Sequence, residues 1–96
     1  MRFIRDEAKR KENLSNHGYD FADARKVFQL PLVLAEDSRH DYGEQRMLAL
    51  GLLETVVVVI VHVEFDDSIR IFSMPDMKNA PNRHETNNYF EKIGPF

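Results

Sequence analysis

The chain contains no cysteine among its 96 residues and no hydrophobic run long enough to cross a bilayer. Without cysteine, disulfides and thiolate metal sites are excluded, and nothing marks the chain for an oxidising compartment. The most hydrophobic stretch, residues 56–63, is far shorter than the roughly 20 apolar residues that a membrane-spanning helix needs. The N-terminal MRFIRDEAKRKEN is charged where a signal peptide needs an apolar run. We therefore expect a cytoplasmic protein.

Composition and charge favour one ordinary globular domain over residues 1–96. Apolar residues make up 43% of the chain and charged residues 30%, which argues against disorder. The formal net charge is -3, so the whole molecule has no long-range attraction for nucleic acid. Any RNA contact must use a local patch, and the basic residues of the N-terminal segment are one candidate. The alternative is that they form an ordinary solvated helix face.

Several common catalytic signatures are missing as well. The sequence has no glycine-rich phosphate loop, no G-x-S-x-G turn and no pair of histidines at metal-ligand spacing. Its isolated histidines are individually weak evidence, because a lone histidine is usually structural. Arg39, Arg46 and Arg70 lie on or beside expected strands, which could aim guanidinium groups at one phosphate. The alternative is that the first two pair with nearby acids along a hairpin.

Cap residues and periodicity predict two helices near the N-terminus. Asp6 is a suitable N-cap for a helix that ends at His17, with Gly18 as the C′ residue. Its apolar stripe is thin, so this helix should lie across the surface. Asp20 then caps a second helix that Pro31 closes. Its apolar face is formed by Phe21, Ala24, Val27 and Phe28.

The remainder of the sequence predicts a sheet and a last helix. Strands are expected at residues 32–35, 47–53, 56–65 and 69–72, with a short edge strand at residues 3–4. The links between the neighbouring strands are short, so antiparallel pairing is expected. Pro81 suits the first turn of a C-terminal helix that Gly94 ends. The predicted fold is α+β, with two N-terminal helices, an antiparallel sheet of about four strands and a C-terminal helix.

Three segments resemble the BrnT family of bacterial toxins, the toxin half of a type II toxin–antitoxin pair. DEAKRKENLSNHGYDFADARKVF is similar to the family's opening helices, DSRHDYGEQRMLALG to its middle motif and IRIFS to its last strand. The middle motif comprises Asp37, Arg39, Tyr42, Gly43, Glu44, Arg46 and Gly51. The resemblance implies a RelE-like fold and a ribonuclease that arrests translation and growth. It also implies a BrnA-type antitoxin, a ribbon-helix-helix DNA-binding protein, which forms a hetero-oligomer with the toxin and represses their operon.

The resemblance also implies a set of site residues. These are His17, Arg39, Glu44, Arg46, Arg70 and Ser73. RNA cleavage of this kind needs a base, an acid and positive charge on the phosphate, and it requires no metal or other cofactor. Arg46 and Arg70 are expected to stabilise the phosphate, His17 or Glu44 to transfer protons, and Ser73 to support them by hydrogen bonding. His40 and His62 are weaker candidates, and His62 can face either the core or a cleft.

The sequence departs from the family pattern just after the last strand. The family continues as Ser-Ala-Arg or Ser-Met-Arg, whereas this chain has Ser73, Met74 and Pro75. We hypothesise that the missing arginine attenuates or inactivates this copy. The competing explanation is natural divergence, with Lys78 or Arg83 supplying the charge. The alternative function is a non-catalytic module that binds antitoxin and acts in operon autoregulation.

Overall fold

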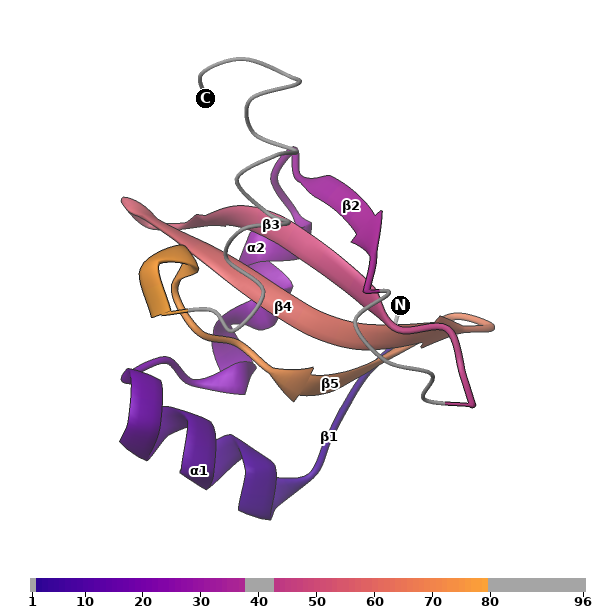
Figure 1. Cartoon of the computed structure of the whole chain (residues 1–96), viewed down its shortest axis with the longest axis horizontal. Helices are drawn as coiled ribbons and strands as arrows, with labels where there is room; N and C mark the ends of the chain where they lie inside the picture. The colour runs from indigo at the N-terminus through magenta and orange to yellow at the C-terminus, as the bar shows by residue number, and fades with distance from the viewer. Residues whose placement is uncertain (1, 38–42, 80–96) are drawn as a thin grey trace.

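The computed structural model describes residues 2–37 and 43–79, and its elements build two helices against a five-stranded sheet (Figure 1). The elements, with two short 3-10 turns η1 and η2, are β1 (Arg2–Arg5), α1 (Glu7–His17), η1 (Phe21–Asp23), α2 (Ala24–Phe28), β2 (Val33–Glu36), β3 (Met47–Leu53), β4 (Val56–Phe65), β5 (Ser68–Ser73) and η2 (Met77–Asn79). The helix expected beyond Pro81, together with Arg39 and His40, lies outside the described residues. No helix within the described ranges is long and apolar enough to cross a membrane.

The sheet has the order β1-β5-β4-β3-β2 and is mixed. Strands β2 to β5 pair antiparallel with their sequence neighbours, as their short links predict. The prediction of a wholly antiparallel sheet of about four strands is wrong at its edge, because β1 pairs with β5 in parallel. After β1, the two helices carry the chain across to β2 at the opposite edge of the sheet. The strands β2 to β5 then leave one side of β5 open, and β1 pairs there in parallel.

Helix α1 begins and ends where its cap residues predict. The Asp6 carboxylate accepts hydrogen bonds from the backbone N–H groups of Ala8 and Lys9. Gly18 has a φ of 81° and donates its N–H to the carbonyl of Leu14. The buried residue of this helix, however, is Asn13, while Leu14 is 43% exposed. A polar side of α1 therefore faces the protein, whereas the thin apolar stripe does not.

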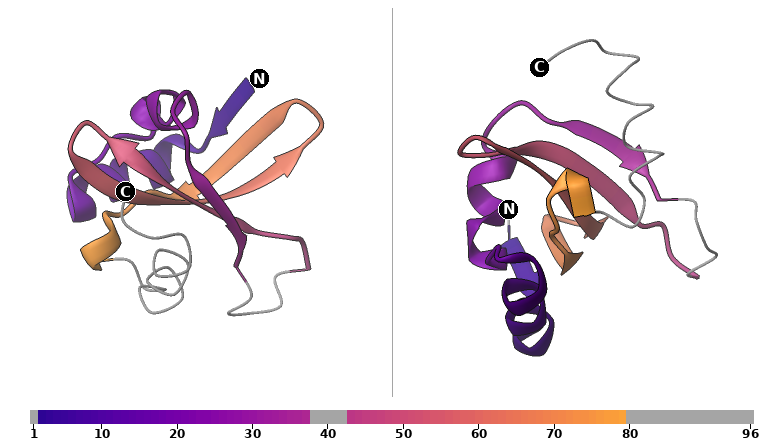
Figure 2. Two further views of the ribbon diagram at one scale, coloured as in Figure 1. Left: turned by 90° about the horizontal axis from the view of Figure 1, so that it is seen from above. Right: turned by 60° about the vertical axis from the view of Figure 1, so that its left-hand side comes forward.

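The core lies on both faces of the sheet. On one face, α2 and η1 bury Phe21, Ala24 and Val27 against β3, β4 and β5. The other face has a second buried cluster that includes Leu48, and η2 lies on this side (Figure 2). In β4, residues of both alternating sets are buried, as its continuous apolar run predicts.

The close packing of α2 on β3 explains one glycine of the middle motif. A Cβ atom added at Gly51 would lie 2.7 Å from Cγ1 of Val27 and 3.3 Å from Cβ of Leu32. A side chain there would push α2 away from the sheet. Gly51 is therefore a packing residue that lets the helix approach the strand.

Candidate functional site

A β-bulge in β5 shapes the strand end that carries the candidate site. His62 pairs with Ile71, but the next residue of β4, Val61, pairs with Ser73. Phe72 is therefore the extra residue, and such a bulge bends the strand and re-aims its side chains. Before the bulge, Ile69 and Ile71 point into the helix-covered core. Arg70 and Phe72 consequently belong to the opposite face.

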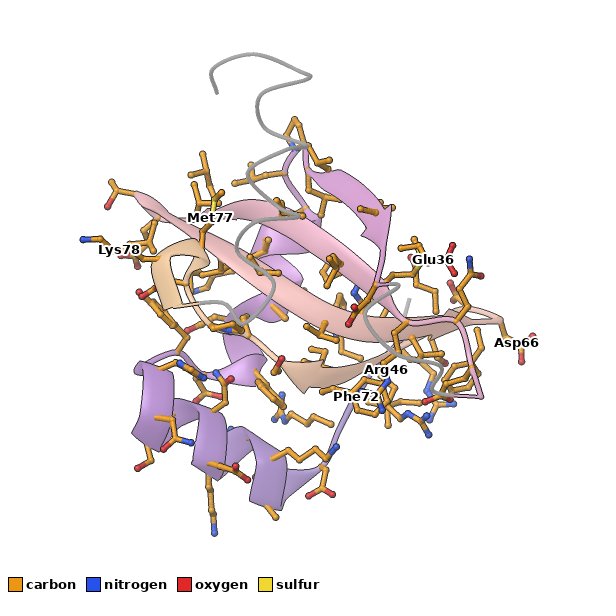
Figure 3. All side chains as sticks on the ribbon, in the orientation of Figure 1. Glu36, Arg46, Asp66, Phe72, Met77 and Lys78 are labelled. Carbon is orange, nitrogen blue, oxygen red and sulfur yellow. The ribbon has the colours of Figure 1, made fainter. Side chains whose placement is uncertain are left out.

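Three basic side chains meet over the ring of Phe72. The Arg46 guanidinium carbon lies 4.1 Å from the ring centroid, the Lys9 ammonium nitrogen 4.7 Å and the Arg70 guanidinium carbon 5.1 Å. Figure 3 shows Arg46 and Phe72 at this end of the sheet. These cations come from the loop before β3, from α1 and from β5, so the fold gathers them from distant parts of the sequence.

Glu44 is the carboxylate of this cluster. Nη2 of Arg70 donates to both of its oxygens, at 3.0 and 3.2 Å, and Nε of Arg46 lies 3.9 Å from Oε1. The side chains of Arg46 and Arg70 are 25% and 43% exposed, so neither side chain is fully enclosed, while the Nε atom of each is buried. The two arginines face the same side of the sheet and can reach a ligand in solution.

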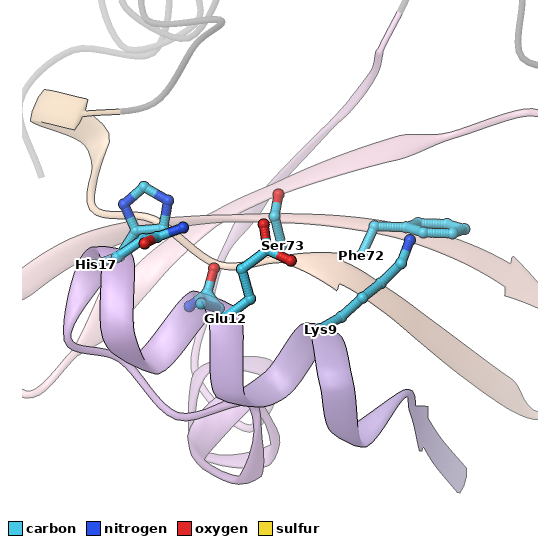
Figure 4. Close-up of a pocket in the computed structure, with 7 residues that line it drawn as sticks. Lys9, Glu12, His17, Phe72 and Ser73 are labelled. Carbon is cyan, nitrogen blue, oxygen red and sulfur yellow. The ribbon is translucent and has the colours of Figure 1, made fainter.

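A polar pocket lies between α1 and the end of β5 (Figure 4). Helical spacing places its α1 residues on one face of that helix. Its volume is about 200 Å³, smaller than the roughly 300–1,000 Å³ of typical small-molecule sites. A second hollow shares Lys9 and Phe72 with it and reaches Arg70, so the two form one open groove. The pocket is lined by Lys9, Glu12, Asn13, Asn16, His17, Phe72 and Ser73.

Buried hydrogen bonds fix the far side of this pocket. Asn13 donates from Nδ2 to the carbonyls of Tyr19 and Met74, and its Oδ1 accepts from the N–H of Met74. The hydroxyl of Tyr19 donates to Asp76 at 3.2 Å. Burial, followed by the charge of Asp76, raises the pKa of Tyr19, which keeps its hydroxyl protonated as a donor. The segment after β5 is thereby held against α1.

A bidentate ion pair ties α1 to the turn that follows it. Nε and Nη2 of Arg10 donate to the two carboxylate oxygens of Asp20, at 2.7 and 2.8 Å. Asp20 also accepts from the N–H of Ala22 as the cap of η1. The hydrogen bonds from Arg10, and then that from Ala22, lower the pKa of Asp20 to about 2. Arg10 is thus a structural residue and does not belong to the groove.

The structure places three of the six predicted site residues in the lining of this groove and two beside it. His17 and Ser73 line the pocket and Arg70 lines the second hollow. Arg46 lies over the Phe72 ring and Glu44 pairs with Arg70, but neither lines either hollow. Arg39 lies outside the described residues.

His62 belongs to the core, which decides between the two environments left open for it. It is fully buried, its ring meets Phe28 edge-on with centroids 5.3 Å apart, and Nδ1 lies 2.9 Å from the carbonyl oxygen of Ile60. Burial lowers the pKa of His62 and so favours the neutral ring.

The sequence reasoning gave no site role to Asn13 and Phe72, and it counted Lys9 only among the basic residues of the N-terminal segment. For Lys9 and Asn13 the available signal was the spacing of polar residues in α1, since positions 9, 13, 16 and 17 fall on one helix face. An apolar stripe was sought there instead. Within residues 2–37 and 43–79, no three acidic or histidine side chains gather as a metal site. The charges that do gather are cations, which suit a phosphate group.

Comparison with known proteins identifies the fold and the family of this chain. The chain is similar in structure to the ribonuclease toxin BrnT of Brucella abortus, known from a 1.1 Å crystal structure, with a TM-score of 0.59 and 24% identity. The match covers 79% of this chain and 95% of that one, and at this identity it establishes the fold alone. No curated protein matches the sequence. Residues 6–80 match the family described as the ribonuclease toxin, BrnT, of type II toxin-antitoxin systems. The chain therefore belongs to the BrnT family of ribonuclease toxins.

Proposed function

We propose that this chain is an endoribonuclease toxin that cleaves RNA in the groove between α1 and β5, acting in the cytoplasm. The observation that carries the proposal is the meeting of Lys9, Arg46 and Arg70 over one aromatic ring, next to the pocket of His17 and Ser73. Positive groups held by a helix, a strand and the residue next to another strand stabilise the negative charge that develops on phosphate. The RelE-like character of the fold and the helix beyond Pro81 remain predictions.

The proposed chemistry uses the substrate's own 2′-hydroxyl as the nucleophile. Arg46 and Arg70 would stabilise the pentavalent phosphate, and Ser73 would hydrogen-bond to the substrate or to a catalytic group. A base must accept the 2′-hydroxyl proton and an acid must protonate the leaving 5′-oxygen. None of these steps needs a metal ion.

Of the two proton-transfer candidates, we favour His17. Both oxygens of Glu44 accept hydrogen bonds from Arg70, so Glu44 already serves to hold that guanidinium. His17 lines the pocket, and within the described ranges its ring has no hydrogen bond or ion pair. Arg39, from the middle motif, is proposed as a further phosphate contact.

The test is cleavage of a single-stranded RNA by the purified chain in the presence of EDTA. Arg70→Gln should lower kcat/KM about 10²–10³-fold, the usual effect of removing one transition-state donor. Arg2→Gln is the matched control, because Arg2 is an exposed arginine on the neighbouring strand β1. A wild-type chain that leaves RNA intact would contradict the proposal, as would equal losses in the two variants.

We further propose that a BrnA-type antitoxin neutralises the toxin by covering this groove, within a hetero-oligomer. The support is membership of a type II toxin-antitoxin family together with the concentrated positive charge. An acidic segment would complement that charge and exclude RNA. Arg70→Glu should then weaken the complex with the antitoxin in a pull-down, whereas Arg2→Glu should leave it intact.

A non-catalytic role in antitoxin binding and operon control is the second candidate. Pro75 favours it, because a buried proline stands where the resemblance implies an arginine. This candidate predicts that the chain binds antitoxin normally and that unmodified RNA survives prolonged incubation with it. Detectable cleavage that Arg70→Gln abolishes would exclude it.

A further inference from the structure

The Phe72 ring is the point at which cations from three parts of the fold meet. Three cations lie within 4.1–5.1 Å of its centroid, and Glu44 is the carboxylate that pairs with two of them. Lys9 has no carboxylate partner in the described part of the chain. The neighbouring carboxylate of Asp6 instead caps α1.

The three cations repel one another, so an attractive interaction must hold them together around the ring. Like charges held this close together near a protein surface repel one another. A ring has two faces, so at least two of the three cations share one of them. The negative face of an aromatic ring attracts each cation directly, and a leucine of similar volume would not.

Phe72 is also fixed by packing. Its ring contacts the buried cluster of Leu48, Leu50 and Val59 on the same face of the sheet. As the extra residue of the bulge, it lies where β5 bends away from regular pairing with β4. The ring therefore has a defined position from which it can set the positions of flexible lysine and arginine side chains.

We propose that Phe72 is the positioning residue of this site and that Lys9 is its third phosphate-binding group. The inference rests on the proposed function and deepens it. The ring brings the ammonium group from α1 onto the same patch as the two guanidinium groups. These three positive groups on one patch would attract the phosphates of an RNA backbone.

The first experiment measures binding of a 2′-O-methyl RNA oligonucleotide, which cannot be cleaved, by fluorescence anisotropy. Phe72→Leu should weaken binding about tenfold, because it removes several cation–π contacts whose combined attraction corresponds to a change of that size in affinity. Phe72→Tyr keeps a π-face and should bind within about twofold of wild type. Phe3→Leu is the control, since the Phe3 ring on β1 has its own cation–π contact, 4.8 Å from Arg25, and packs against the other core cluster.

Lys9→Ala gives a second, independent measurement should Phe72→Leu lower the melting temperature strongly. It should weaken binding about fivefold and reduce the salt slope by about one, as expected for one lost phosphate contact. Lys11→Ala, an exposed lysine on the same helix, should change neither quantity.

The double variant isolates the positioning role. If the ring places Lys9, Lys9→Ala should cost less in the Phe72→Leu background than in wild type. Additive losses would overturn the positioning role, and unchanged binding by Phe72→Leu or Lys9→Ala would overturn the inference, as would no binding by wild type. Cleavage of unmodified RNA is scored separately: a chain that binds with this pattern but never cleaves contradicts the proposed function alone.

Discussion

The side-chain amide of Asn13 pairs with the backbone of Met74 in both directions. Nδ2 donates to the Met74 carbonyl at 3.0 Å, and Oδ1 accepts from the Met74 N–H at 2.9 Å. The parallel partner β1 covers β5 as far as Ile71, so beyond that point the edge of the last strand needs other partners. One amide supplies them and attaches α1 to the sheet beside the pocket.

Asn13→Ala should destabilise the protein by about 2–3 kcal/mol, because it leaves buried backbone groups of Met74 without partners. Urea denaturation followed by circular dichroism measures the change. Asn16→Ala is the matched control, since Asn16 is an exposed asparagine in the next turn of α1, and it should change stability by less than about 0.5 kcal/mol.

Asn13→Asp separates hydrogen bonding from side-chain volume. Aspartate has nearly the same shape, but it places an acceptor against the carbonyls of Tyr19 and Met74. The free energy of unfolding of Asn13→Asp should therefore be no higher than that of Asn13→Ala at pH 7. An Asp variant with wild-type stability would show that the amide is not the attachment point.

Much of the fold was predictable because its signals are local. The bounds of β3 and β4 follow from apolar runs closed by a tight turn, and Asp6 and Gly18 mark the ends of α1. The buried side of α1 was not predictable in this way. Asn13 is buried because it hydrogen-bonds to Met74, 61 positions away, and no window of neighbouring residues contains that information.

The candidate site shows the same difference between local signals and long-range contacts. The resemblance pointed to Arg46 and Arg70, which do meet on one side of the sheet. Phe72 and its contact with Lys9 were not predicted, because their proximity depends on the bulge in β5 and on where α1 lies beside it. The parallel pairing of β1 likewise depends on which sheet edge remains open, which is settled by the whole topology.

Asp20 should make stability depend on pH in the acid range. The hydrogen bonds from Arg10 lower its pKa from 3.8 to about 2, so the folded state binds this proton less readily than the unfolded state. The resulting stabilisation is fully present above pH 3.8 and is lost as the pH falls to about 2. We expect the urea midpoint of wild type to fall over this window and that of Asp20→Asn to fall less.

Asp23→Asn is the control for this measurement, because Asp23 is a more exposed aspartate of the same turn that pairs with Lys26. It should keep the wild-type pH profile. Parallel profiles for wild type and Asp20→Asn would show that the pair with Arg10 does not distinguish the folded from the unfolded state.

Glu44→Gln should strengthen RNA binding and lower the catalytic rate much less than His17→Gln does. Removing the carboxylate deprives Arg70 and Arg46 of their shared negative neighbour, so the affinity for a 2′-O-methyl oligonucleotide should rise severalfold. If Glu44 serves to hold the arginines, kcat should fall less than about tenfold, whereas His17→Gln should lower it about 10²–10⁴-fold as loss of a general base does.

Glu36→Gln, at an exposed glutamate of β2, controls for the change in net charge and should affect neither quantity. The opposite ranking, with Glu44→Gln nearly inactive and His17→Gln nearly normal, would transfer the proton-transfer role to Glu44.

Pro75→Arg should increase toxicity if the missing arginine attenuates this copy. Pro75 is buried, and its carbonyl accepts a hydrogen bond from the N–H of Val59 at 2.9 Å, so the segment continues along β4 after β5 ends. An arginine can keep that bond, because the carbonyl is backbone, and would add positive charge two residues beyond Ser73. We expect earlier growth arrest after induction than with wild type, at matched protein levels.

Pro75→Ala separates the added charge from the loss of the proline ring. It should behave like wild type in the growth assay, while Lys78→Ala tests whether Lys78 supplies the missing charge by divergence. Toxicity that is the same for wild type, Pro75→Ala and Pro75→Arg would reject attenuation. If Lys78→Ala alone then lost toxicity, the compensating charge would be assigned to Lys78, which is exposed in η2 on the sheet face opposite α2.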